Sequence, residues 1–263
     1  MNNCNKIGFI VTTTVCSAIS TLVVSQPSLT QIAPEATTIQ TTTISGKLRD
    51  FRSNHPDFER SPGDISSDGS VFQFGLDTAI VTDTLGTDGK PVYAGGSYST
   101  TNKENFDQWF NDVEGINTSM DYAITLTDED GDGTYTFARD IDQTESFFPL
   151  DEKLFGNENN AHNYHFTYEL ETEFTYVPGT DLNPRIFTFK GDDDVYVYID
   201  GKKVIDIGGV HIQREQSVNL DELNLVDGET YSLKLFFAER HIVHSNFRID
   251  TNIKLPEIVA FAD

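Results

Sequence analysis

Three consecutive carboxylates, Asp192, Asp193 and Asp194, follow Gly191 and directly precede an alternating apolar run. Adjacent carboxylates repel one another unless a cation or a set of hydrogen-bond donors offsets their charge. Hard oxygen ligands of this kind suit calcium. The same residues also suit a turn in which the side chains accept hydrogen bonds from backbone amides. Spacing alone leaves the calcium site and the turn about equally favoured.

A second acidic cluster has the pattern D-x-D-x-D-G, formed by Asp128, Asp130, Asp132 and Gly133. This pattern is the first half of an EF-hand-type calcium loop. The twelfth position of the loop is Arg139, where an EF-hand carries a bidentate Glu, so the segment is not an EF-hand. A polar hairpin turn explains the residues slightly better, and a second calcium site is the alternative.

Four of the six histidines form two pairs with the same spacing, His162 with His165 and His241 with His244. On a helix this spacing would place both side chains on one face. On a strand, residues three apart point to opposite faces, so neither pair favours a zinc site. We expect these histidines to hydrogen-bond loops or to contact a polar ligand.

No motif for enzymatic chemistry is present: the sequence contains no G-x-S-x-G, P-loop, H-E-x-x-H or dinucleotide fingerprint. With 42 acidic residues, some carboxylate pair could always be proposed as a glycosidase dyad. The separation that such a dyad needs is not readable from sequence. We therefore expect a binding or structural protein and no enzyme.

The charge balance excludes two classes of partner. The 263 residues include 18 Lys and Arg against 42 Asp and Glu, a formal net charge of −24. Such a field repels phosphate backbones and anionic lipids, so neither nucleic acid nor a membrane surface is expected as a partner. Solubility in an extracellular medium accounts for most of these charges, and the carboxylates also provide ligands for calcium.

The first 46 residues have the composition of a leader and a linker. Residues 1–25 carry one charge, Lys6, before an apolar run with small residues at its end, which predicts a secretory signal peptide. Both cysteines, Cys4 and Cys16, lie in this segment, so the mature chain would contain no disulfide. Residues 26–46 are rich in Thr, Ser, Gln and Pro and are expected to be a linker.

We thus expect a secreted, extracellular or cell-surface protein without a membrane span. The last segment, residues 257–263, is a short tail that cannot cross a bilayer. The sequence assigns no oligomeric state.

The remaining chain has the period-two pattern of strands over residues 165–176, 195–199, 231–237 and 247–255. Asp200-Gly201 is a two-residue hairpin signal. One short helix is expected within residues 102–113. Short strands separated by Gly, Asp and Pro turns predict an all-β antiparallel β-sandwich with long loops and at most short helices.

The run FTFKGDDDVYVYIDGKKVIDIGGVH, residues 187–211, resembles the signature of the fibro-slime domain family. Those domains are similar to the protective-antigen-type β-sandwich, a secreted carbohydrate-associated module. Further segments match the family in the same order along the chain, so the resemblance covers a domain at residues 47–256. Two features depart from the family pattern: Tyr196 stands where Trp is more usual, and the D-x-D-x-D-G loop is not a family feature. Supporting segments lie at residues 48–59, 110–117, 147–151, 162–176 and 236–251.

The resemblance implies a calcium site. In the sugar-binding relatives, two aspartates joined by a cis peptide bond chelate calcium, which in turn holds two sugar hydroxyls. In this sequence the pair corresponds to Asp192 and Asp193, because the hairpin at Asp200-Gly201 then falls in register. Asn246 is the candidate side-chain ligand from a second loop. Asp194 is either a third ligand or a cap at the start of the strand.

The resemblance also implies a rim around the calcium where a sugar would be contacted. His211 and Tyr196 come from the central motif, and His244 and Ser245 come from the loop before the last strand. The expected function is that of a secreted calcium-dependent carbohydrate-binding, lectin-like or adhesive module with a glycan or polysaccharide partner. The alternative is an extracellular matrix or coat protein with purely structural calcium and a protein partner.

Overall fold

The computed structural model describes residues 39–66, 69–140, 142 and 145–256. The predicted signal peptide at residues 1–25 and the tail at residues 257–263 lie outside the described residues. All described residues belong to one compact unit. None of the helices in the described part of the chain is long and apolar enough to cross a membrane.

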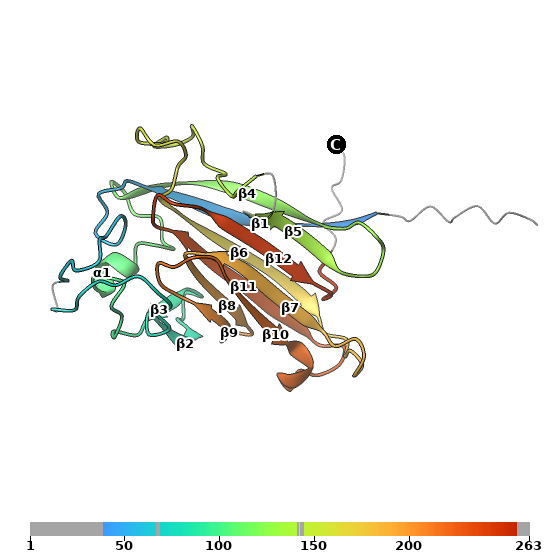
Figure 1. Cartoon of the computed structure of the whole chain (residues 1–263). Coiled ribbons are helices and arrows are strands. Elements are labelled where there is room, and N and C mark those ends of the chain that lie inside the picture. Colours follow the sequence, from blue (N-terminus) through green and yellow to red (C-terminus); the bar gives the residue numbers. More distant parts are fainter. Residues whose placement is uncertain (1–38, 67–68, 141, 143–144, 257–263) are drawn as a thin grey trace, which may run out of the picture. The chain divides into compact units, whose positions relative to one another are not determined.

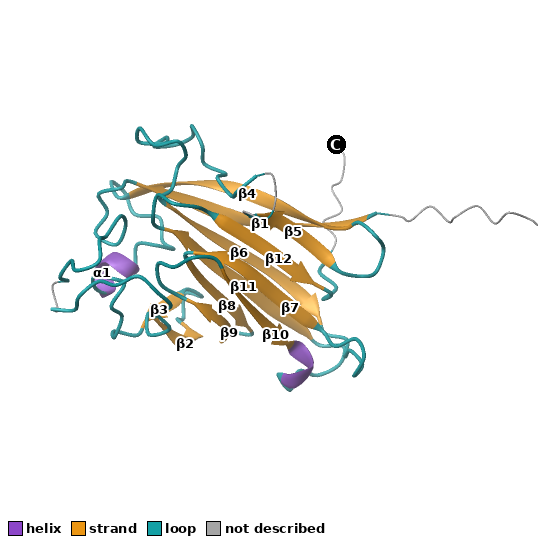
Figure 2. Ribbon diagram, in the orientation of Figure 1, coloured by secondary structure: helices purple, strands orange, loops and turns teal. Residues whose placement is uncertain are grey.

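The described chain is almost entirely β-structure (Figure 1, Figure 2). Its strands and two short helical segments are β1 (Gln40–Phe51), β2 (Val81–Leu85), β3 (Pro91–Tyr93), α1 (Lys103–Phe106), β4 (Asn117–Asp128), β5 (Tyr135–Arg139), β6 (Phe166–Thr175), β7 (Ile186–Asp192), β8 (Asp194–Ile199), β9 (Lys202–Ile207), β10 (Arg214–Asn219), the 3-10 turn Leu220–Glu222, β11 (Thr230–Glu239) and β12 (Asn246–Thr251). The all-β prediction is confirmed.

The strands form one 12-stranded sheet in the order β10-β7-β12-β5-β4-β1-β6-β11-β8-β9-β2-β3. All its strand pairs are antiparallel. β7 and β8 follow one another in the chain yet lie far apart in this order. Rings from β7 and β12 contact a ring of β11, so the sheet curls until its two parts face each other across a shared core.

Aromatic rings hold the two parts of the curled sheet together. Phe247 of β12 lies 5.2 Å from the ring of Phe237 on β11 and 5.0 Å from Phe189 on β7. Phe147, from the loop before β6, packs at 4.7 Å on the same ring. Each of these rings is at most 1% exposed. Large rings compensate for the low aliphatic content of the chain, because each buries a large apolar area.

The long segment between β1 and β4 carries α1, β2 and β3 and covers one side of the sheet (Figure 1). Phe106, Trp109 and Phe110 pack there against Tyr198 and Phe236 on the outer face of β8 and β11. The short helix expected within residues 102–113 is present as α1. Its cap is Asn102, whose side chain accepts a hydrogen bond from the amide of Asn105 at 2.9 Å.

The boundary expected for the linker is wrong at its end. Residues 26–46 were predicted to be linker, but β1 begins at Gln40 and pairs with β4 over its whole length. Thr42 and Ile44 alternate inward and are at most 5% exposed. Threonine-rich composition favours an exposed linker and a strand alike, since Thr is β-branched, and only the alternation distinguishes them here.

The aromatic core predicts a large loss of stability for Phe247→Ala. Removing this ring leaves a cavity between the two parts of the sheet, and such substitutions cost about 3–5 kcal/mol. Leu182→Ala is the control, because Leu182 is 98% exposed and its truncation should change stability by less than about 0.5 kcal/mol. Urea denaturation of both variants measures the difference. Equal stabilities would contradict this account of the core.

Candidate functional site

Three consecutive aspartates occupy the junction between β7 and β8. Asp192 ends β7, Asp194 begins β8, and the peptide bond between Asp192 and Asp193 is cis. All three residues are buried. The structure thus contains the cis bond that the family resemblance implies, at the predicted pair.

Asp194 faces the interior, where it forms an ion pair with Arg240 of the loop after β11. Arg240 Nε lies 2.6 Å from Asp194 Oδ2, and both side chains are fully buried. The other carboxylate oxygen accepts hydrogen bonds from the amide of Gly209 at 2.6 Å and from the Tyr196 hydroxyl at 3.0 Å. Asp194 therefore anchors the strand, and it does not reach the cavity described below.

Arg240 ties this ion pair to the segment between β1 and β4. Its Nη1 donates to the carbonyl oxygens of Ser99 at 2.7 Å and Asp57 at 3.2 Å. The guanidinium carbon lies 4.7 Å above the ring centroid of Trp109, whose Nε1 donates to Asp57 Oδ2. Burial disfavours the charged form of Arg240, but the charges of Asp194, Asp193 and Asp57 together with the hydrogen bond to Asp194 outweigh this effect and raise its pKa.

The register between β7 and β12 brings Asp192 and Asn246 together as directly opposed residues. The Asn246 amide donates to Asp192 Oδ1 and its side-chain Nδ2 donates to Asp192 Oδ2, both at 2.7 Å. Rotation of the Asn246 side-chain amide by 180° would direct its oxygen where the nitrogen now lies. The pair can therefore offer carboxylate and amide oxygens from two adjacent strands.

Asp193 is held by backbone amides from two different loops. The amide of His211 lies 3.2 Å from Oδ1, and the amide of Arg240 lies 3.2 Å from Oδ2. Because both contacts are long, each carboxylate oxygen keeps acceptor capacity for another partner. We call Asp192, Asp193 and Asn246 the cavity floor.

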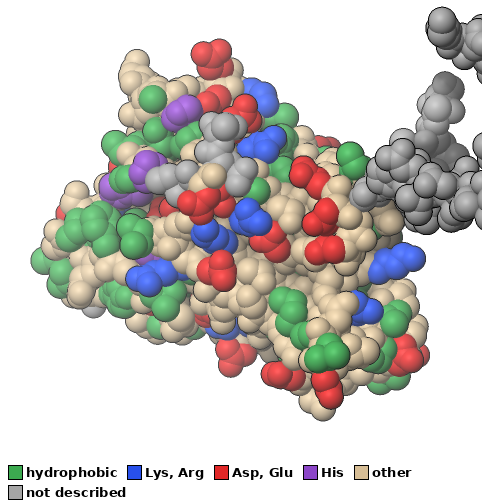
Figure 3. Space-filling view, turned by 45° about the vertical axis from the view of Figure 1, so that its right-hand side comes forward, with side chains coloured by type: hydrophobic (Ala, Val, Ile, Leu, Met, Phe, Trp, Pro, Cys, Tyr) green, Lys and Arg blue, Asp and Glu red, His purple; other side chains and the backbone are tan. Residues whose placement is uncertain are grey.

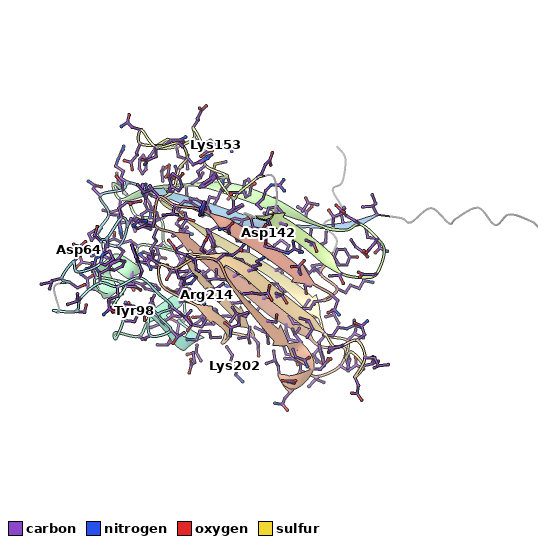
Figure 4. The ribbon with its side chains drawn as sticks, in the orientation of Figure 1. Asp64, Tyr98, Asp142, Lys153, Lys202 and Arg214 are labelled. Carbon is purple, nitrogen blue, oxygen red and sulfur yellow. The ribbon has the colours of Figure 1, made fainter. Side chains whose placement is uncertain are left out.

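A cavity of about 350 Å³ opens above this floor. Loops from three parts of the chain enclose it: one between β1 and β2, one between β9 and β10, and one between β11 and β12. Arg214, labelled in Figure 4, begins β10 directly after the second of these loops. Besides the floor, the lining residues are Phe74, Val210, His211, Ile212, Gln213, His241, Val243 and His244.

Two glycines allow the first two loops to lie against each other. A Cβ atom on Gly209, which has φ +103°, would come within 2.2 Å of the Gly75 carbonyl oxygen. A Cβ atom on Gly208 would come within 2.5 Å of the Asp77 carbonyl oxygen. The gap is closed by hydrogen bonds from the amide of Gly75 to Val210 O at 2.8 Å and from that of Asp77 to Gly208 O at 2.6 Å. A larger residue at either position would therefore force these two loops apart.

The electrostatics of the floor are dominated by burial. Burial raises the pKa of Asp192 to about 6, against hydrogen bonds from Asn246 that lower it. Burial likewise raises the pKa of Asp193 well above its usual range, and the Arg240 charge opposes this only in part. Burial lowers the pKa of His211, which favours the neutral imidazole beside the floor.

These residues fit calcium by their chemistry. Among the described residues, no Lys, Arg or His nitrogen forms an ion pair with the Asp192 or Asp193 carboxylate. Two buried carboxylates without a side-chain cation carry a desolvation cost that a divalent ion would offset. The donor set is all oxygen once the Asn246 amide is rotated, and hard oxygen donors suit calcium rather than zinc.

Several residues predicted at this site lie elsewhere. His211 and His244 line the cavity with the floor residues. Tyr196 and Ser245, expected on the rim, are both fully buried. Tyr196 alternates onto the outer face of β8, where it packs under α1, so the strand periodicity removes it from the rim.

The second acidic cluster lies in the hairpin between β4 and β5. The carboxylates of Asp128, Asp130 and Asp132 offer oxygens within 4.8 Å of one another. Both oxygens of Asp128 accept hydrogen bonds from the loop, from Gly131 N at 2.8 Å and Gly133 N at 3.0 Å. The turn thus forms with Asp128 as its internal cap, and a second calcium site stays a prediction.

Sequence reasoning missed the apolar residues of the cavity and one buried acid. Phe74 and Ile212 lie in loops with no periodicity that would assign them to a site. Glu239 ends β11, is fully buried, and accepts a hydrogen bond from His241 N at 3.3 Å. Burial and the nearby Asp193 and Asp192 raise the pKa of Glu239 well above its usual range. The only indication of Glu239 in the sequence is that an acidic residue ends the apolar run of β11.

The ion pair beneath the floor predicts that Arg240→Met destabilises the protein by about 3–5 kcal/mol, since it leaves the Asp194 carboxylate buried and unpaired. Arg139→Met is the matched control, because Arg139 pairs with Glu145 at the surface and should contribute less than about 1 kcal/mol. Chemical denaturation measures both. The double variant Asp194→Asn with Arg240→Met should lose less than the sum of the two single changes. An Arg240→Met variant as stable as Arg139→Met would contradict the anchoring role.

Comparison with known proteins finds a family model that matches part of the chain. Residues 183–260 match the PA14 domain. This stretch contains β7 to β12 and all three floor residues. The match agrees with the protective-antigen-type part of the resemblance described above.

The chain is homologous to psi proteins of Dictyostelium discoideum. Protein psiC is 37% identical over 193 residues, which cover 67% of this chain and 36% of the relative. Protein psiD is 36% identical over 212 residues, covering 74% of this chain and 40% of the relative. The chain therefore spans well under half the length of these relatives.

Solved structures show weaker likenesses. The PA14 domain of the MpAFP antifreeze protein has 9% identity and a TM-score of 0.29, covering 88% of this chain and 90% of that one. The GH31 alpha-xylosidase from Xanthomonas citri has 10% identity and a TM-score of 0.33, covering 78% of this chain and 22% of that one. Residues 183–260, which match the PA14 domain, carry the whole cavity floor.

Proposed function

We propose that this protein is a secreted, calcium-dependent carbohydrate-binding module with an adhesive role. The observation that carries the proposal is the cavity floor: two buried carboxylates that form no ion pair with a Lys, Arg or His of the described chain, beside an amide, at the base of an open cavity. The PA14 match over the same residues supports a carbohydrate ligand. A calcium ion held there would supply a hard positive centre at which sugar hydroxyls replace water.

The protein's own groups would orient the ligand. Asp192 and Asp193 hold the cation, and the Asn246 amide completes the floor from β12. His244 lines the cavity, where its imidazole would contact a sugar hydroxyl, whereas the ring nitrogens of His211 face the carbonyl oxygens of Ile212 at 2.9 Å and Ile207 at 3.4 Å. No residue is assigned a catalytic role. Binding at one such shallow site should be weak, so adhesion would depend on several sites acting together.

Calcium titration of the purified protein by calorimetry tests the proposal, using Asp193→Asn beside the natural chain. We expect the variant to lose one calcium ion and, with it, retention on a glycan panel, because one of the two charged ligands is gone. A chelator should abolish retention of the natural chain in the same way. Asp200→Asn is the matched control: Asp200 lies in the β8–β9 hairpin at φ 50°, which Asn adopts readily.

The remaining outcomes separate the alternatives. If Asp193→Asn unfolds, Asn246→Ala replaces it, since that change removes a neutral ligand. Calcium binding that persists in both variants and disappears in Asp132→Asn would place the ion at the β4–β5 hairpin instead. Calcium bound at the floor with no glycan retained would favour a structural ion and a protein partner. No calcium binding by the natural chain would overturn the proposal.

A further inference from the structure

The cavity has a second, chemically different surface beside its floor. Phe74, Ile212 and Val243 come from the three enclosing loops and together form what we call the apolar wall. Their exposed fractions are 49%, 79% and 61%. In the space-filling view, hydrophobic side chains gather with histidines at the loop end of the sheet (Figure 3). A ligand that contacts both this apolar surface and the carboxylates beside it must carry an apolar group and polar groups.

The apolar wall is held in place by contacts of the Phe74 loop with its neighbours. The Phe74 ring meets the His241 ring edge-on, with centroids 5.2 Å apart, and the Phe72 ring at 5.6 Å. The next residue, Gly75, donates its amide to Val210 O at 2.8 Å, which joins the Phe74 loop to the loop that carries Ile212. The distance between wall and floor is therefore set by the fold.

From this juxtaposition we propose that the site selects a neutral sugar residue that bears a methyl group, from a 6-deoxy position or an N-acetyl group. The inference rests on the proposed function and names its ligand class. Hydroxyls of the sugar would face the floor, and the methyl group would lie on the apolar wall. The 350 Å³ cavity is near the lower end of ligand-site volumes, about 300–1,000 Å³, so it suits one sugar residue.

Other ligand chemistries fit this cavity less well. A fully hydroxylated sugar would turn a hydroxyl toward the apolar wall and lose its hydrogen bonds to water without replacement. An acyl chain would satisfy the wall but leave the floor without hydroxyls. The net charge of −24 disfavours anionic sugars. The methyl-bearing neutral sugar satisfies the floor, the wall and the charge together.

Calorimetry in calcium tests the inference with three pairs of free sugars that differ at one substituent. The pairs are L-rhamnose with L-mannose, L-fucose with L-galactose, and N-acetyl-D-glucosamine with D-glucose. We expect the methyl-bearing member of at least one pair to bind about tenfold more tightly, the discrimination that one methyl group in an apolar pocket provides. The pair that responds identifies the deoxy or the N-acetyl source.

The double variant Ile212→Ser with Val243→Ser tests whether the wall is responsible. It should reduce the preference, measured as the ratio of the two affinities within the responding pair, at least fivefold. Val226→Ser is the matched control, because the exposed fraction of Val226, 59%, is similar to that of Val243. Val226 lies outside the three loops that enclose the cavity.

The outcomes separate the two proposals. Calcium-dependent binding with equal affinity within every pair would overturn the methyl-group inference and leave the proposed function standing. A preference that the double variant retains would assign the selection to other residues and would also overturn it. If none of the six sugars is bound in calcium, the proposed function fails and the inference fails with it.

Discussion

The buried ion pair between Asp194 and Arg240 is the interaction on which the rest of the site depends. Two full charges without solvent access are stabilised when their remaining donors and acceptors find partners. Gly209 and Tyr196 donate to the aspartate, and backbone carbonyls and the Trp109 ring contact the arginine, while Arg240 Nη2 has no hydrogen-bond partner among the described residues. One contact thereby joins the β7–β8 junction, the loop after β9 and the covering segment.

This arrangement divides three adjacent aspartates between two tasks. Asp194 forms an ion pair with Arg240 inside the protein. Asp192 and Asp193 instead accept hydrogen bonds from neighbouring amides. Among the described residues neither carboxylate forms an ion pair with a side-chain cation, and the Arg240 charge only partly offsets the burial that raises the pKa of Asp193. The same Arg240 also donates its backbone amide to Asp193, so the cation that neutralises one aspartate positions its neighbour without neutralising it.

The parts of this design that are visible in the sequence are those encoded by local patterns. Alternation revealed β6, β8, β11 and β12, and Asp200-Gly201 revealed the β8–β9 hairpin, because both signals depend on neighbouring residues. The family resemblance directed attention to Asp192, Asp193 and Asn246. Tyr196 was misplaced because a strand with apolar residues on both faces gives no inward direction. Phe74 was invisible, since its place depends on loop contacts with Val210 over a long sequence separation.

Because the floor lies on strands and the apolar wall on loops, substitutions in the two surfaces have different effects. The floor lies on strand ends whose register is fixed by β7 and β12, so substitutions there disturb the sheet as well as the ligand. The wall consists of exposed loop residues, and Ile212 and Val243 are 79% and 61% exposed, so exchanging either costs little stability. A scaffold built this way can keep one means of holding hydroxyls while its loops alter which sugar is accepted.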